Sequence, residues 1–259
     1  FSNYIYFSSG MPKLSGHFKA YADDIISRFC RPSDFIMEIA SNDGILLKHF
    51  QDSGFRVLGI DPATNVAELA NERGVKTVND FFSEKFALEI VSREGKPRII
   101  MGNNVVAHID DHHDLARGLK ALLADDGIFV MEAPYLVDMF ENLSYDTIYH
   151  EHLSYLAVAP LAVLFEKFDL EIFEVQLHPV QGQSIRVFVG HKGAYPIHKS
   201  VGEFIAKEDA LKLGNIVSYE ALARRVEASK NRLVAQVTAI FGAGKRVAAY
   251  GAPAKGNTV

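Results

Sequence analysis

The chain has 259 residues, of which 48% are hydrophobic and 23% are charged, which is the balance of an ordinary soluble globular protein. Its net charge of −5 comes from 32 acidic and 27 basic residues without a long basic run, so we expect no nucleic-acid partner. No apolar stretch reaches the roughly 18 residues of a membrane span, and no signal peptide opens the sequence. Cys30 is the only cysteine, which excludes an internal disulfide and a cysteine-based zinc site here and fits a reducing cytoplasm.

Strands and helices alternate along the first half of the sequence. From Leu14 to Phe29, apolar side chains recur at helical spacing, which predicts an amphipathic helix. Short apolar runs predict strands at 35–39, 56–61, 76–78, 97–102 and 127–132, with helices between them at 44–50, 63–73, after 79–82 and at 115–123. This alternation predicts an α/β fold with a mostly parallel, doubly wound sheet.

The pattern changes after Pro134. A long irregular segment is followed by an expected helix at 161–168 and by strands at 171–175 and 184–190. These two strands could form an antiparallel hairpin at the end of the sheet. We expect helical structure from about residue 201 to 241 and a new strand at 245–250, which would begin a second α/β domain.

The first expected strand ends in a turn of small residues, Glu38-Ile-Ala-Ser-Asn-Asp-Gly44, which leads into a helix. Ligands of open α/β sheets bind at the carboxyl ends of the strands, and the N–H groups at a helix start can bind them. A dinucleotide-binding turn would read G-x-G-x-x-G, but this turn has one glycine, and Glu38 and Asp43 would repel a diphosphate. The turn is therefore better suited to a cationic cofactor.

Carboxylates also follow the next two strands. Asp61 can accept both hydroxyls of a ribose, and Asp80 is placed to bind an adenine amino group with Phe81 against the ring. These residues and the turn resemble the class I S-adenosylmethionine-dependent methyltransferases and their E-x-G-x-x-x-G pattern. Ala40 replaces the first glycine, which costs little if the turn keeps a negative φ. The resemblance implies that S-adenosylmethionine is bound by Glu38, Ala40, Ser41, Asn42, Gly44, Asp61, Pro62, Asp80, Phe81, Phe82 and Asn103.

The segment Tyr145-Asp-Thr-Ile-Tyr-His-Glu-His-Leu-Ser-Tyr155 combines three tyrosines, two histidines and two carboxylates. In an extended conformation, Tyr149 and Glu151 would point to one side, and His150 and His152 to the other. A turn would instead let Tyr149, Glu151 and His152 converge on one cavity, where a base, an acid and hydroxyl donors would meet. The alternative is a polar loop that precedes a helix.

The closer resemblance is to the sugar C-methyltransferases that act on nucleotide-activated 4-keto-deoxyhexoses. It covers nearly the whole chain, and besides segments 38–44 and 145–155 it rests on Tyr4-x-Tyr6-x-Ser8-Ser9, His17-Phe18, Asn103-Asn104-Val105-x-Ala107-His108-Ile109, Glu132-x-Pro134-Tyr135 and Tyr250-Gly-Ala-Pro-Ala-Lys-Gly256. The resemblance implies that a base removes the C3 proton beside the C4 ketone and that the enolate carbon attacks the methyl group of the cofactor. By position in the motif, His152 is this base, and Tyr149 and Glu151 orient it or stabilise the enolate.

The same resemblance implies substrate contacts and a domain organisation. The substrate-contacting positions are Tyr4 or Tyr6, Asn104, His108, Tyr135, Arg186 and Lys255. We expect a lead-in and substrate-contacting segment at 1–30, a cofactor-binding methyltransferase domain at 31–195, a helical linker at 196–242 and the start of a second Rossmann-like domain at 243–259. In the family a zinc-binding domain precedes this region, so we expect both ends to be cut and no metal within this chain.

One motif departs from the family. Relatives tend to read His-Gly-Gly-Ser-x-Arg, whereas this chain has Gln181-Gly-Gln-Ser-Ile-Arg186. The bulk of Gln183 leaves the exact sugar and the acceptor atom open.

Three other functions compete with methyl transfer. A metal hydrolase would need ligands beyond the two histidines at 150 and 152, and Asp110-Asp-His-His-Asp114 is interpreted as a solvated helix cap. A nicotinamide-dependent oxidoreductase would share the fold, and a non-catalytic binding domain would share the nucleoside pocket.

Segment 250–256 lacks phosphate-loop spacing, but its main-chain amides and Lys255 could bind a diphosphate. We expect a monomer or weak dimer whose partner is a small nucleotide sugar.

Overall fold

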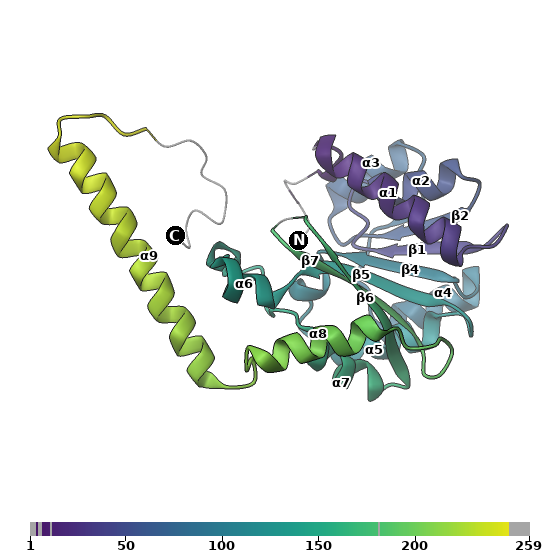
Figure 1. Cartoon of the computed structure of the whole chain (residues 1–259). Coiled ribbons are helices and arrows are strands. Elements are labelled where there is room, and N and C mark those ends of the chain that lie inside the picture. The colour runs from purple at the N-terminus through teal and green to yellow at the C-terminus, as the bar shows by residue number, and fades with distance from the viewer. Residues whose placement is uncertain (1–3, 5–6, 11, 181, 249–259) are drawn as a thin grey trace.

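Helices cover both faces of one central sheet, and a long helix extends away from it (Figure 1). The computed structural model describes residues 4, 7–10, 12–180 and 182–248. Within these ranges the chain has the α/β fold that the alternation of strands and helices predicted. No helix within these ranges has the length and apolar character of a membrane span.

In the described part of the chain, seven strands pair in the order β3-β2-β1-β4-β5-β7-β6. The first five are parallel, whereas β7 is antiparallel to both β5 and β6, as the expected hairpin requires. The strands are β1 (Phe35–Ile39), β2 (Arg56–Ile60), β3 (Thr77–Val78), β4 (Ile99–Asn103), β5 (Ile128–Pro134), β6 (Leu170–His178) and β7 (Ser184–His191). The strand order reverses between β1 and β4, so their carboxyl ends form the switch point where such sheets bind ligands.

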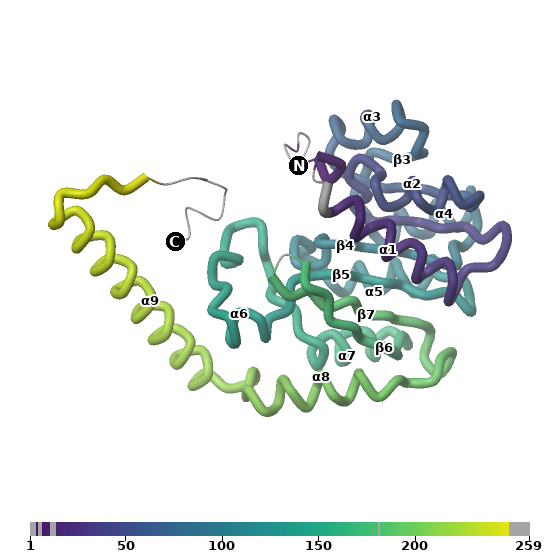
Figure 2. Tube along the Cα trace, turned by 45° about the horizontal axis from the view of Figure 1, so that its top comes forward, coloured from purple at the N-terminus to yellow at the C-terminus, as the bar shows by residue number. Residues whose placement is uncertain are grey.

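The sheet separates two hydrophobic cores because its strands are apolar on both faces. In β1, Met37 and Ile39 belong to one core and Ile36 belongs to the other. The first core is covered by α4 (Glu84–Glu94), α5 (His112–Leu122) and α7 (Val158–Glu166). The second is covered by α1 (Pro12–Phe29) and α2 (Ile45–Asp52), while α3 (Thr64–Glu72) lies beside β3 at the sheet edge (Figure 2).

The second half of the chain differs from the prediction in three places. The helix α6 (Leu136–Asn142) forms inside the segment that we expected to be irregular. The expected helical region is two helices, α8 (Lys199–Ala210) and α9 (Ile216–Gly242), separated by a turn in which Lys212 has a φ of +53°. Residues 245–248 form no strand, and the rest of the strand expected at 245–250 lies outside the described residues. The division into four parts stays a prediction.

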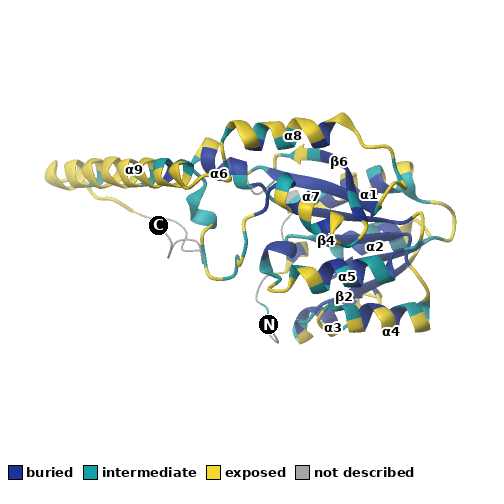
Figure 3. Cartoon of the chain, turned by 90° about the horizontal axis from the view of Figure 1, so that it is seen from below, coloured by how far each residue is buried: buried dark blue, intermediate teal, exposed yellow. Residues whose placement is uncertain are grey.

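The helix α9 is exposed along most of its length (Figure 3). Its buried residue is Leu222, which packs against Met139 and Phe140 of α6. Arg225 of α9 also donates hydrogen bonds to the carbonyls of Phe140 and Glu141. The base of α9 is therefore held against α6, and α6 leads directly into the segment with the histidines.

Candidate active site

The turn after β1 has a left-handed backbone at three of its residues. The φ angle is +55° at Ala40, +50° at Asn42 and +77° at Gly44. The condition under which Ala40 would cost little, a negative φ, is therefore not met, and a left-handed residue other than glycine costs about 1–2 kcal/mol. Gly44 is required, because a Cβ there would lie 2.9 Å from Val75. The main-chain N–H of Asn42 is held by Asp61 Oδ2 at 2.9 Å, so contacts with β2 stabilise this turn.

Glu38 is a buried carboxyl at the end of β1. It is 4% exposed, and its Oε1 accepts a hydrogen bond from Asn103 Nδ2 at 3.1 Å. Burial raises the pKa of Glu38 to about 8 against the opposing effect of that bond. No Lys, Arg or His in the described ranges forms an ion pair with it. A cationic group placed beside Glu38 would therefore return its carboxyl to the charged form.

Asp61 directly follows β2 and has a fixed orientation. Its two carboxylate oxygens accept the main-chain N–H groups of Asn42 and Ala63, each at 2.9 Å. Burial raises the pKa of Asp61, and the two backbone donors oppose this effect. A carboxylate oxygen has two lone pairs, so both oxygens retain capacity for ribose hydroxyls. The half-buried Pro62 follows it in the chain.

The residues expected at the adenine ring differ in exposure. Asp80 lies at the surface, and its Oδ1 accepts the main-chain N–H of Phe81 at 2.7 Å. The Phe81 ring is 60% exposed, whereas Phe82 is half-buried and packs against the first core. Phe81 is thus on the surface after β3, and its contact with adenine stays a prediction.

Buried oxygen atoms that lack a hydrogen-bond partner within the described ranges are concentrated where β1 and β4 end. Five of them lie there: Glu38 Oε2, Ser41 Oγ, Asp43 Oδ1, Asn103 Oδ1 and Asn104 Oδ1. Two others, Ser154 Oγ and Gln183 Oε1, lie elsewhere. Buried polar atoms normally have partners, so this set of acceptors predicts a ligand with several hydrogen-bond donors. S-adenosylmethionine has an ammonium group and two ribose hydroxyls, and these residues fit it.

The histidine-rich segment forms a turn after the 3-10 helix η3 (Tyr145–Thr147), not an extended strand. The main-chain N–H of His152 donates to the carbonyl of Tyr149 at 3.0 Å, and their rings lie 4.4 Å apart. His152 Nδ1 lies 2.8 Å from the Thr147 carbonyl oxygen. The His150 side chain is 85% exposed, and the half-buried Glu151 carboxylate lies 3.9 Å from it. The turn thus brings Tyr149 and His152 together and leaves His150 outside.

The loop after β4 meets this turn through His108, in the 3-10 helix η2 (Val106–His108). The rings of His108 and His152 lie 5.0 Å apart, edge to face. Burial lowers the pKa of His108, with Glu151 acting in the opposite direction. The main-chain N–H of Leu153 also donates to the Ala107 carbonyl at 2.8 Å. The turn is therefore fixed beside the strand ends where the cofactor is expected.

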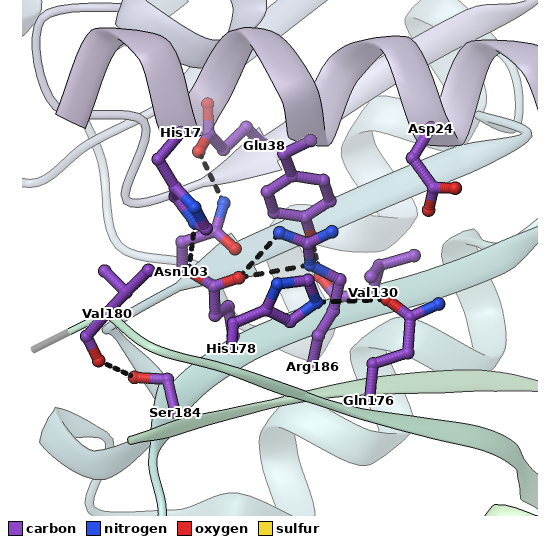
Figure 4. Close-up of polar contacts among 12 residues, drawn as sticks. His17, Asp24, Glu38, Asn103, Val130, Gln176, His178, Val180, Ser184 and Arg186 are labelled. Carbon is purple, nitrogen blue, oxygen red and sulfur yellow. Dashed lines mark hydrogen bonds and ion pairs between the residues drawn. The ribbon is translucent and has the colours of Figure 1, made fainter. Parts of the chain in front are cut away.

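Two residues assigned to the substrate by resemblance contact other protein side chains. Tyr135 is 2% exposed and donates its hydroxyl to Glu208 Oε1 of α8 at 2.9 Å. Arg186 donates two hydrogen bonds to Glu132 Oε2, at 2.7 and 3.1 Å, and its guanidinium lies 3.5 Å from the centroid of the Tyr21 ring. Figure 4 shows Arg186 in this cluster, between α1 and the sheet. In this structure both residues lie inside the protein, and their contact with substrate stays a prediction.

No site role was predicted for His17, which lies in the same cluster as Arg186 and Glu132 (Figure 4). Its Nε2 lies 2.6 Å from Glu132 Oε1, and its ring centroid lies 6.0 Å from that of His178. Burial alone would raise the pKa of Glu132, but the His17 hydrogen bond and the Arg186 charge lower it. The pair His17-Phe18 was part of the family motif, but no local pattern connects His17 with a partner 115 residues away.

Other predicted residues have simpler outcomes. Tyr6 and Lys255 lie outside the described residues. Asp111 is the N-cap of α5 and accepts the main-chain N–H of Asp114 at 2.9 Å, which confirms the interpretation of this motif as a helix cap. Across the described ranges, no group of three or more histidine, cysteine or acidic side chains could hold a metal.

The strand order, the turn after β1 and the carboxylates at the strand ends define the class I methyltransferase fold. The chain belongs to the methyltransferase family. Residues 15–175 match the model of the methyltransferase domain, and residues 179–259 match the C-methyltransferase C-terminal domain. These matches confirm the resemblance to C-methyltransferases and S-adenosylmethionine as the cofactor, in place of a nicotinamide.

Similar proteins agree with this assignment. The C-methyltransferase NovU of Streptomyces niveus is 36% identical over 261 residues, which cover 100% of this chain and 62% of NovU. The chain thus spans less than two thirds of that relative. The magnesium protoporphyrin IX methyltransferase of Synechocystis PCC 6803, solved with bound S-adenosylhomocysteine, aligns with a TM-score of 0.52 and 11% identity over 69% of this chain and 83% of its own. A putative methyltransferase of Haloferax volcanii, solved with the Trm112 activator, aligns with a TM-score of 0.55 and 13% identity. The alignment covers 71% of this chain and 93% of that protein. Both structures show the same fold.

Proposed function

We propose that this chain carries out S-adenosylmethionine-dependent C-methylation of a nucleotide-linked 4-keto-deoxysugar. The observation that carries the proposal is the pairing of Tyr149 and His152 in one turn, beside His108 and the strand ends of the cofactor site. A small keto-sugar could present its acidic C–H to this group of imidazole and phenol side chains. The family match and the relative NovU support carbon as the methyl acceptor.

The hydrogen bond at Nδ1 prepares His152 to act as a base. A carbonyl oxygen accepts only, so the 2.8 Å contact with Thr147 places the proton on Nδ1. In this tautomer Nε2 is the basic nitrogen of the ring. The edge-to-face packing of His108 and the contact with Tyr149 hold the ring in this orientation.

Tyr149 is suited to donate a hydrogen bond to the oxygen of the substrate. Burial and the nearby Glu151 carboxylate raise the pKa of Tyr149, so its phenol stays protonated near neutral pH. As His152 Nε2 takes the proton from C3, the electron pair of the broken C–H bond moves into the enolate, and its oxygen becomes an acceptor for the phenol. When bound, S-adenosylmethionine would supply an electrophilic methyl group to the C3 carbon of this enolate.

Proton exchange at C3 tests this function without depending on methyl transfer. With a nucleotide-linked 4-keto-6-deoxysugar in deuterated buffer, wild type should exchange the C3 proton, observed by NMR or mass spectrometry. His152→Ala should exchange this proton about 10²–10⁴-fold more slowly than wild type. Its affinity for S-adenosylhomocysteine should be unchanged. His150→Ala is the matched control, since its exposed ring faces solvent. Exchange and methylation by His152→Ala at near wild-type rates would exclude His152 as the base.

A further inference from the structure

A segment near the N-terminus lies across the cofactor turn, and we call residues 4 and 7–10 the strap. Its described end lies beside α3 in both views of the chain (Figures 1 and 2). The main-chain N–H of Ser8 donates to Asn42 Oδ1 at 3.0 Å. The main-chain N–H of Ser9 donates to Asp43 Oδ2 at 3.3 Å, and the Ser9 hydroxyl donates to the same oxygen. The strap therefore binds two consecutive residues of the left-handed turn.

Two residues of the α3 region hold the strap in place. Arg73, at the C-terminal end of α3, donates to Asp43 Oδ2 at 2.8 Å and to the Ser9 hydroxyl at 2.9 Å. The Asp43 side chain is 0% exposed, so this arginine both neutralises a buried carboxylate and joins it to the strap.

At the other end of the strap, Asn65 pairs with the backbone of Tyr4 in both directions. Asn65 Oδ1 accepts the main-chain N–H of Tyr4 at 2.9 Å, and Asn65 Nδ2 donates to the Tyr4 carbonyl at 2.7 Å. One amide side chain thus fixes both polar groups of a residue 61 positions away.

We infer that Asn65 and Arg73 are positioning residues for cofactor binding, which they control through the strap. The turn needs outside support, because Ala40 and Asn42 have positive φ angles, which residues other than glycine adopt infrequently. Asn42 joins the two parts, since its side chain binds the strap and its main-chain N–H binds the Asp61 carboxylate. Release of the strap should therefore loosen both the turn and the carboxylate expected at the ribose.

Calorimetry with S-adenosylhomocysteine tests the inference on the full chain. Arg73→Met and Asn65→Leu each remove two hydrogen bonds, and each should weaken binding by about three- to tenfold. In the double variant, the affinity should fall by less than the product of the two single fold-changes, because release of either end already frees the strap. Arg73→Lys should restore part of the affinity, because it keeps a cation beside Asp43. Glu72→Gln, an exposed change on the same helix, is the control and should bind like wild type.

Thermal unfolding of each variant without cofactor separates this role from a general loss of stability. Asn65 is half-buried and Arg73 is exposed, so Asn65→Leu and Arg73→Lys should unfold at midpoints close to that of wild type. Arg73→Met leaves the buried Asp43 carboxylate without its cation and should lower the midpoint. Wild-type affinity in both variants would overturn the inference, and so would a lower midpoint without any change in affinity. The experiment contains no sugar, so a failure of the proposed keto-sugar chemistry would leave its result unchanged.

Discussion

The buried carboxyl of Glu38 predicts that the cofactor-free protein becomes less stable as pH rises. Burial raises the pKa of Glu38 from its ordinary value of 4.5 to about 8. Between these values the folded protein keeps a proton that the unfolded chain has released, so the free energy of unfolding decreases by up to about 1.4 kcal/mol per pH unit. The contribution of Glu38 is fully present below pH 4.5, decreases through neutral pH and is lost once pH exceeds about 8.

Glu38→Gln removes the titration and keeps the shape of the side chain. Its free energy of unfolding relative to wild type should increase by about 3 kcal/mol between pH 4.5 and pH 7. Urea titrations at several pH values measure this difference, and other titrating groups cancel because both proteins contain them. Glu68→Gln, at an exposed position of α3, is the control. The difference between its free energy of unfolding and that of wild type should not change over the same pH range.

The same variant should have the opposite effect on binding. A neutral amide attracts the ammonium group of the cofactor less than a carboxylate does, so Glu38→Gln should weaken binding of S-adenosylhomocysteine while it stabilises the free protein. Wild type should release a proton on binding below pH 8, which calorimetry in buffers of different ionisation enthalpy detects. A difference in unfolding free energy that stays constant within about 1 kcal/mol from pH 4.5 to 8 would refute the reasoning, since a solvated Glu38 would titrate near its ordinary value.

Two further substitutions test other parts of the site. Asp61→Ala should weaken S-adenosylhomocysteine binding by about 1.5–3 kcal/mol, the value of lost hydrogen bonds to a charged group, and unchanged affinity in calorimetry would exclude Asp61 as the ribose ligand. Glu208→Gln should lower the free energy of unfolding by about 1–3 kcal/mol, because the buried Glu208 carboxylate accepts hydrogen bonds from the Tyr135 hydroxyl and from the main-chain N–H groups of Val158 and Ala159. A urea midpoint equal to that of wild type would contradict this second expectation.

The strands β1, β4, β5 and β7 were predictable because each is a short, largely apolar run that is buried on both faces. The expected bounds of β1 agree with the structure, and those of β2 and β7 differ by one residue. The helix α6 was missed because it has seven residues and includes the buried Asp138, so it shows no helical periodicity. The break between α8 and α9 had a local signal in Asn215, whose side chain caps α9, but Lys212 adopts its positive φ without a glycine.

Side-chain pairs across the sheet could not be predicted from the sequence. Glu132 and Arg186 are direct neighbours because the antiparallel register of β5 and β7 places them opposite each other. That register depends on which strands pair and in which direction, and neither can be derived from the local pattern around Arg186. Its resemblance to a substrate-binding arginine therefore gave no sign of the buried ion pair with Glu132.

The sequence placed carboxylates at the strand ends, but only the structure shows which of them a cation already neutralises. Arg73 pairs with Asp43, and Arg186 pairs with Glu132. In the sequence, Glu38 and Asp43 together indicate a negative site for a cationic cofactor, yet Glu38 is the one of these two that has no ion pair with any described residue. A buried carboxyl without such a partner takes a proton or binds a cation. The positive charge of S-adenosylmethionine should therefore be recognised at Glu38, while Asp43 acts in the attachment of the strap.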